Sequence, residues 1–129
     1  TGRCLTISPD YIKYADDEVL CIPQIEDLEG IENAEAIASV DGVDIGFLGP
    51  ADLALSMGVE RGHPDHEAAL QRFRKGCARA GKPSGIPVAN GLDAKRRIEE
   101  GFQFIDLGND LRFLEITAKE NFLEVKDLL

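Results

Sequence analysis

Residues 24–52 read QIEDLEGIENAEAIASVDGVDIGFLGPAD, and this stretch decides the fold. It contains an apolar strand that ends at Glu26, an amphipathic helix, and a second apolar strand that runs into Asp52. Equivalent points on neighbouring parallel strands recur after one strand–helix–strand unit of roughly 30 residues, and neighbouring strands lie about 4.8 Å apart. We therefore expect Glu26 and Asp52 to lie side by side, close enough for their carboxylates to share one divalent cation.

Outside this stretch the chain continues to alternate strands with helices. Apolar, β-branched runs are typical of parallel strands covered on both faces, whereas apolar residues at three- and four-residue spacing indicate helices. The predicted strands cover residues 19–25, 43–48, 85–89 and 102–107, and the predicted helices cover residues 9–15, 28–37, 51–57, 66–80, 94–100 and 111–129. Four strand–helix units predict a parallel α/β sheet, about half of a TIM (β/α)8 barrel. We expect residues 1–129 to form this single partial-barrel domain.

The composition is that of a soluble globular protein, with 43% hydrophobic and 29% charged residues in a chain of 129. The formal net charge of −10 argues against nucleic acid and anionic membranes as partners, because both require a basic patch that neutralises phosphate. The favoured ligands are cations, or anions presented to a bound cation.

The three cysteines, Cys4, Cys21 and Cys77, are odd in number and lie in unrelated sequence contexts. A disulfide framework is therefore not expected, and we interpret them as reduced thiols of a cytoplasmic protein. No apolar run approaches the roughly 20 residues needed to span a bilayer. No charged-then-apolar leader opens the chain.

The segment around the two carboxylates has the features of a ligand site. Gly49-Pro50-Ala51 lets a ligand approach the backbone closely, and the amides at the start of the next helix form an anion site. Gln24 points to the same face as Glu26 by the period of two, and is placed to donate a hydrogen bond to a ligand oxygen. The alternatives are that Glu26 and Asp52 are helix-capping or first-turn acids, and that Gln24 is a satisfied core amide.

Other polar residues have simpler explanations. His63 and His66 are three residues apart beside an aspartate, but the start of a helix explains them better than metal ligation does. Asn90 and Asp110 follow the third and fourth predicted strands, where capping or structural roles are expected rather than catalysis.

With these residues the chain resembles the HpcH/HpaI aldolase family, metal-dependent class II pyruvate aldolases that cleave and form 2-keto-4-hydroxy acids. The resemblance implies that Glu26 and Asp52 ligate a magnesium, manganese or cobalt ion. It also implies that Gln24, Ala51 and Asp52 line a pocket for pyruvate, which reacts with an aldehyde. The resembling stretches are PQIE at 23–26, GVDIGFLGPADL at 42–53, GHP at 62–64, GK at 81–82 and GI at 85–86.

The resemblance covers only the carboxyl-terminal half of such enzymes, which are full barrels of about twice this length. The catalytic histidine and arginine that the family places on earlier strands have no counterpart in this sequence. Pro87 stands where the family usually has an aliphatic residue at the pocket wall. The implied mechanism runs through a metal-bound pyruvate enolate, with the cation stabilising its charge. We expect weak or absent activity from this chain alone.

Two hypotheses remain open from the sequence. The first is a metal-dependent pyruvate aldolase-like carbon–carbon lyase that works as part of a complete barrel or assembles one from two half-barrels. The second is a truncated, non-catalytic half-barrel that binds metal or keto acid, or serves only as an oligomer or structural fragment. Both predict a homo-oligomer, because open parallel edges favour association. In the family, the last helix often packs on a neighbouring subunit, and the helix at 111–129 is its counterpart.

Overall fold

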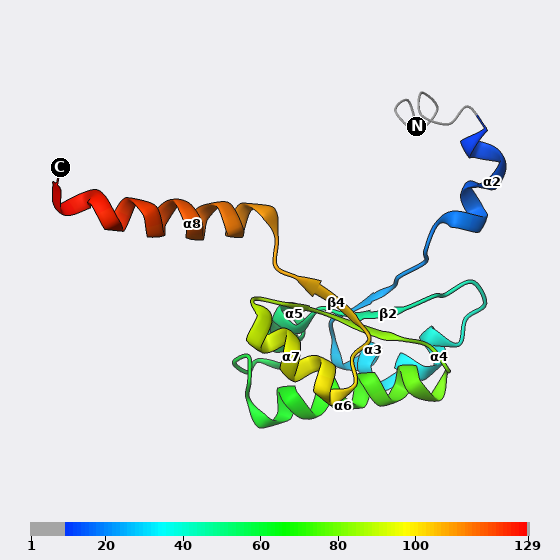
Figure 1. Cartoon of the computed structure of the whole chain (residues 1–129). Helices are drawn as coiled ribbons and strands as arrows, with labels where there is room; N and C mark the ends of the chain where they lie inside the picture. Colours follow the sequence, from blue (N-terminus) through cyan, green and yellow to red (C-terminus); the bar gives the residue numbers. More distant parts are fainter. Residues whose placement is uncertain (1–9, 129) are drawn as a thin grey trace.

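The computed structural model describes residues 10–128, and its centre is a four-stranded parallel sheet (Figure 1). Each strand lies next to the one before it in the chain, so the order is β1-β2-β3-β4. The strands are β1 (Gln24–Ile25), β2 (Gly46–Leu48), β3 (Ser84–Val88) and β4 (Phe104–Leu107). Consecutive parallel strands joined by helices are the arrangement of a (β/α)8 barrel, and four of them make half of one. The predicted fold class is therefore confirmed.

The helices follow the strands in the predicted order. They are α2 (Tyr11–Glu18), α3 (Leu28–Glu32), α4 (Ala34–Ala38), α5 (Pro50–Met57), α6 (Pro64–Arg79), α7 (Gly91–Glu100) and α8 (Asp110–Val125), with a short 3-10 turn η1 (Lys126–Leu128). None of the helices within residues 10–128 is long and apolar enough to cross a membrane.

Several elements differ from the sequence prediction; for example, the strand expected at 43–48 is reduced to Gly46–Leu48. The helix expected at 28–37 is broken at Asn33, whose side-chain amide donates a hydrogen bond to the Glu29 carbonyl at 2.9 Å. Such local side-chain bonding competes with continuous helix. The strand expected at 19–25 is reduced to two residues, although Cys21 still pairs with Asp44 through backbone hydrogen bonding. Pro23 has no N–H to donate, although its carbonyl oxygen accepts a hydrogen bond from the Phe47 N–H at 3.0 Å.

The two faces of the sheet are different. Ile25, Leu48 and Ile86 point to one face and are at most 4% exposed. Helices α3, α4, α6 and α7 lie on one side of the sheet, whereas α2 and α8 extend away from it (Figure 1). The hydrophobic core therefore lies between the sheet and this helical layer.

The opposite face carries one residue from each strand at the same level. The register aligns Gln24 with Phe47, Phe47 with Gly85, and Gly85 with Phe104. The rings of Phe47 and Phe104 meet edge to face, 6.0 Å apart, across Gly85, where a Cβ would lie 2.7 Å from the Phe47 ring. In a closed barrel this face lines the interior, and here Phe104 remains 37% exposed.

Candidate functional site

A cavity of about 370 Å³ opens at the carboxyl ends of the strands, where parallel α/β folds place their sites. Its wall comes from β1, α5, the ends of β3 and β4, and the start of α8. The lining residues are Gln24, Gly49, Pro50, Ala51, Asp52, Arg61, Pro87, Val88, Ala89, Asp106, Gly108, Asn109 and Arg112. The predicted residues Gln24, Ala51 and Asp52 therefore share one cavity.

Glu26 lies beside this cavity, held between Gln24 and Gly49. Gln24 Nε2 donates a hydrogen bond to Glu26 Oε2 at 2.7 Å, as expected for residues two apart on one strand face. A Cβ on Gly49 would lie 2.7 Å from Glu26 Oε2 and 2.9 Å from Gln24 Nε2. Position 49 therefore requires glycine for space, because its φ of −96° suits any residue. Within residues 10–128, Glu26 Oε1 has no hydrogen-bond partner.

Asp52 lies in the first turn of α5 and not at a strand end. The register pairs Ile25 with Leu48, so Glu26 lies level with Gly49, three residues before Asp52. The expected equivalence of the two carboxylates on neighbouring strands is therefore wrong in register. The N–H groups of Ala51 and Asp52 belong to the first turn of a helix, where they have no intrahelical acceptor. Gly49 provides no side-chain cap for them.

The donor set suits a hard divalent cation. Carboxylate oxygens from Glu26 and Asp52 are ligands that magnesium and manganese prefer. Within residues 10–128 no three or more histidine, cysteine, aspartate or glutamate side chains gather around one point. Two carboxylates are enough for a magnesium-like ion, because such an ion keeps several water ligands and shares others with its substrate.

Three charged residues of the cavity were not predicted from the sequence. Asp106 lies on β4 opposite Pro87, and the period-two alternation of that strand would have placed it on the cavity side. Arg61 lies in the loop after α5, and Arg112 lies in the first turn of α8. Neither arginine side chain forms an ion pair or hydrogen bond within the described part of the chain. Arg61 and Arg112 are far apart in the sequence, so only the tertiary fold brings them to the same cavity.

The capping predictions are confirmed for His63 and Asn90, whereas the side chain that caps α8 is Asn109 and not Asp110. The side chain of His63 accepts a hydrogen bond from the Asp65 N–H at the start of α6. Asn90 caps α7 by accepting from the Asp93 N–H at 2.9 Å. Asp110 accepts from the adjacent Leu111 N–H at 2.8 Å.

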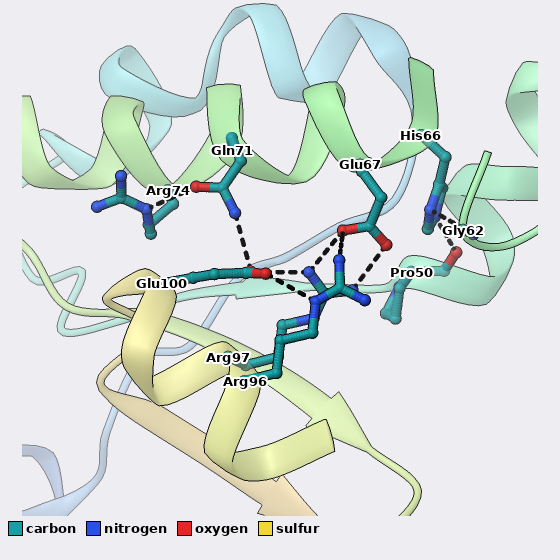
Figure 2. A network of polar contacts seen from close by, with 9 residues as sticks. All are labelled: Pro50, Gly62, His66, Glu67, Gln71, Arg74, Arg96, Arg97 and Glu100. Carbon is teal, nitrogen blue, oxygen red and sulfur yellow. Dashed lines mark hydrogen bonds and ion pairs between the residues drawn. The ribbon is translucent and has the colours of Figure 1, made fainter. Parts of the chain in front are cut away.

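A network of ion pairs joins α6 to α7 (Figure 2). Glu67 accepts from both terminal nitrogens of Arg97, at 2.7 and 2.8 Å, and from Arg96 at 2.8 Å. Glu100 accepts from Arg97 at 2.8 Å and from Gln71 at 2.9 Å. The hydrogen bond from Arg97 holds the pKa of Glu67 below its ordinary value, although partial burial acts in the opposite direction. The pKa of Arg97 is raised by the same bond.

The cysteines differ in exposure. Cys21 is exposed and Cys77 is buried, and both are free thiols. Burial raises the pKa of the Cys77 thiol to about 11. Cys4 lies outside the described residues.

The fold and the site together define a class: a parallel half-barrel with acidic, amide and backbone N–H groups gathered at the carboxyl ends of its strands. A family model of the HpcH/HpaI aldolase/citrate lyase family matches residues 3–115. The chain belongs to this family.

Individual relatives agree with that assignment. Hydroxypyruvate/pyruvate aldolase of Pseudomonas aeruginosa is 39% identical over 113 residues, covering 86% of this chain and 42% of the relative. The 5-keto-4-deoxy-D-glucarate aldolase of Klebsiella pneumoniae is 39% identical over 112 residues, which cover 85% of this chain and 44% of that enzyme. The solved structure of an HpcH/HpaI aldolase/citrate lyase family protein from Burkholderia cenocepacia superposes with a TM-score of 0.83 at 34% identity. The match covers 91% of this chain and 46% of the Burkholderia protein. The chain thus spans less than half the length of these relatives.

Proposed function

We propose that this chain provides the cation- and pyruvate-binding half-site of a metal-dependent aldolase-type carbon–carbon lyase acting on 2-keto-4-hydroxy acids. The observation that carries the proposal is the convergence of Gln24, Ala51 and Asp52 on one cavity, with Glu26 bonded to Gln24 beside it. Family membership and the aldolase relatives support the same reaction class.

Each residue of the half-site has a role that suits its chemistry. The carboxylates of Glu26 and Asp52 would hold a magnesium, manganese or cobalt ion. The backbone N–H groups of Ala51 and Asp52, at the positive end of α5, would bind the carboxylate of pyruvate. Gln24 uses one side-chain N–H for Glu26 and keeps a second for a substrate oxygen.

The chemistry divides between the cation and the protein. When bound, the cation would stabilise the negative charge that develops on pyruvate as a methyl proton leaves. A positioned general acid or base typically raises the reaction rate about 10²- to 10⁴-fold. No histidine is among the described residues that line the cavity. We therefore expect pyruvate binding with weak or absent aldolase turnover from this chain alone, and turnover when an aldehyde and a complete barrel are present.

A second candidate function is a non-catalytic half-barrel that binds a cation or keto acid and acts only as an oligomer or structural element. The exposed apolar side chains of α8 favour this reading, because they suit contact with another protein surface. In both cases we propose a cytoplasmic homo-oligomer, since Cys21 and Cys77 are free and the sheet has open edges.

The test measures binding and proton transfer separately. Thermal melts of the wild type and Glu26→Ala would be recorded alone, with Mn²⁺, and with Mn²⁺ and pyruvate. Exchange of the pyruvate methyl protons in D₂O would be followed by NMR. Glu29→Ala is the matched control, because Glu29 is an exposed acid in the first turn of α3.

The outcomes separate the two functions. Stabilisation by Mn²⁺ that Glu26→Ala loses and Glu29→Ala keeps would support the half-site. Methyl-proton exchange would favour the enzyme, and binding without exchange would favour the non-catalytic half-barrel. If Mn²⁺ does not stabilise the wild type, the metal site is wrong.

A further inference from the structure

His66 lies at the start of α6 and is almost fully buried, with 2% of its surface exposed. Its Nδ1 lies 3.4 Å from the Gly62 N–H, and its Nε2 lies 2.8 Å from the Pro50 carbonyl oxygen (Figure 2). A backbone N–H only donates and a carbonyl oxygen only accepts. His66 is therefore assigned as the neutral imidazole that carries its proton on Nε2.

These two hydrogen bonds hold both ends of one segment of the cavity wall. Pro50 is the first residue of α5 and immediately precedes Ala51 and Asp52. Gly62 has a φ of +86° and follows Arg61, which lines the cavity. One buried ring thus bridges the turn that carries the site amides and the loop that carries Arg61.

The ring is itself held firmly. α6 packs Leu70, Phe73 and Cys77 into the core, each 0% exposed. The next residue, Glu67, forms its paired hydrogen bonds with Arg97 of α7. The imidazole therefore projects from a helix that is fixed on two sides toward a turn that has no side-chain cap of its own.

We propose that His66 is a positioning residue for the pyruvate half-site: its Nε2–H fixes the Pro50 peptide, and with it the Ala51 and Asp52 amides. His66 does not touch the substrate. It acts through the orientation of the first turn of α5, where a small rotation would turn the N–H groups away from a bound carboxylate. This inference rests on the proposed function of that site.

The test compares two substitutions that differ in one hydrogen bond. His66→Gln keeps a side-chain N–H that can reach the Pro50 carbonyl, whereas His66→Phe fills a similar volume without any donor. Pyruvate affinity would be measured by calorimetry at saturating Mn²⁺. We expect His66→Phe to weaken pyruvate binding about tenfold, the effect of roughly one misplaced hydrogen bond, and His66→Gln to restore most of it. His63→Asn is the control, because His63 is an exposed cap of the same helix.

A second measurement needs no variant. Long-range ¹H–¹⁵N spectra of the wild type report which imidazole nitrogen carries the proton, and Nε2 is expected. The Nε2–H resonance is also expected to shift when Mg²⁺ and pyruvate are added together. A proton on Nδ1, or a resonance that does not respond to a ligand that binds, would overturn the inference even if the variants do not fold.

The failures are distinguishable. If the wild type binds pyruvate and His66→Phe binds it equally well, the positioning role is wrong and the proposed half-site stands. If the wild type binds neither Mn²⁺ nor pyruvate, the proposed function is wrong, and the role of His66 falls with it.

Discussion

At the residue scale, the space around Glu26 depends on the missing side chain of Gly49. A Cβ there would lie 2.7 Å from Glu26 Oε2 and 2.9 Å from Glu26 Cβ, closer than non-bonded atoms normally approach. The carboxylate and the Gln24 amide would both have to move.

Gly49→Ala is therefore expected to damage ligand binding more than folding. Overpacking typically costs about 1–3 kcal/mol, whereas the Gln24–Glu26 pair would lose its present geometry. We expect the stabilisation by Mn²⁺ to be largely lost, as measured by thermal melts. Gly91→Ala is the control, since nothing lies within 4 Å of a Cβ at Gly91. Unchanged Mn²⁺ stabilisation in Gly49→Ala would contradict this role.

Cys77 gives a prediction about alkaline pH. Burial raises the pKa of its thiol from 9.0 to about 11, so the folded state favours the neutral thiol. Its contribution to stability is complete below about pH 9 and is lost as the pH rises toward 11. Urea unfolding between pH 8 and 11 should show a steeper loss for the wild type than for Cys77→Ala. Cys21→Ala, at an exposed thiol, should keep the wild-type slope; equal slopes in all three would refute the assignment.

At the element scale, α6 and α7 are joined by ion pairs that are largely screened from solvent. The side chains of Arg97 and Glu67 are 12% and 22% exposed. If one partner is removed, the remaining side chain stays partly buried but loses its hydrogen bonds, and this costs about 1–3 kcal/mol of stability.

Arg97→Ala should therefore destabilise the fold by roughly 1–3 kcal/mol at pH 7, as measured by urea unfolding. Arg72→Ala removes the same charge from an exposed position on α6 and should have little effect. Because the pKa of Glu67 is lowered, its contribution is present above pH 4.5 and is lost as the pH falls further. The difference between wild type and Arg97→Ala should shrink at pH 3. An equal difference at both pH values would argue against the ion pair.

Helix α8 has apolar residues that the described chain leaves uncovered. Leu111, Leu114 and Phe122 are 75%, 68% and 57% exposed, and their spacing places them on one face. A helix with such a face is normally buried against another surface.

We expect the double substitution Leu114→Glu and Phe122→Glu to lower the oligomeric mass measured by light scattering after gel filtration. Leu92→Glu, at a residue that is 79% exposed on α7, should leave the mass unchanged. A wild type that elutes as a stable monomer would remove the basis for this prediction.

Much of the element order could be predicted from the sequence because it depends on local patterns. The apolar run at 43–48 and the capping signal at Asn90 both act within a few residues. The break in the helix at Asn33 was missed because the regular spacing of apolar residues predicts one continuous helix and does not reveal the hydrogen bond from the Asn33 side chain to the Glu29 carbonyl. The contacts of His66 with Pro50 and Gly62, and the position of Arg61 at the cavity, were missed because they exist only after the chain has folded.

At the scale of the whole molecule, the sheet is half of a barrel with its interior face open. Gln24, Phe47, Gly85 and Phe104 form one level of that face, and the cavity lies at its carboxyl end. The site residues all come from strand ends and helix starts on this one half. The position of Gln24 beside Glu26 therefore depends on local geometry within this half, and not on the remaining strands of a complete barrel.

The most direct test of the central claim is a calorimetric titration of pyruvate into the wild type and Asp52→Asn, with and without Mn²⁺. We expect pyruvate to bind the wild type only when Mn²⁺ is present. We also expect Asp52→Asn to weaken that binding by about tenfold or more, the effect of losing one charge-assisted contact. Pyruvate binding that is independent of Mn²⁺, or equal in the two proteins, would contradict the claim that these residues form a cation–pyruvate half-site.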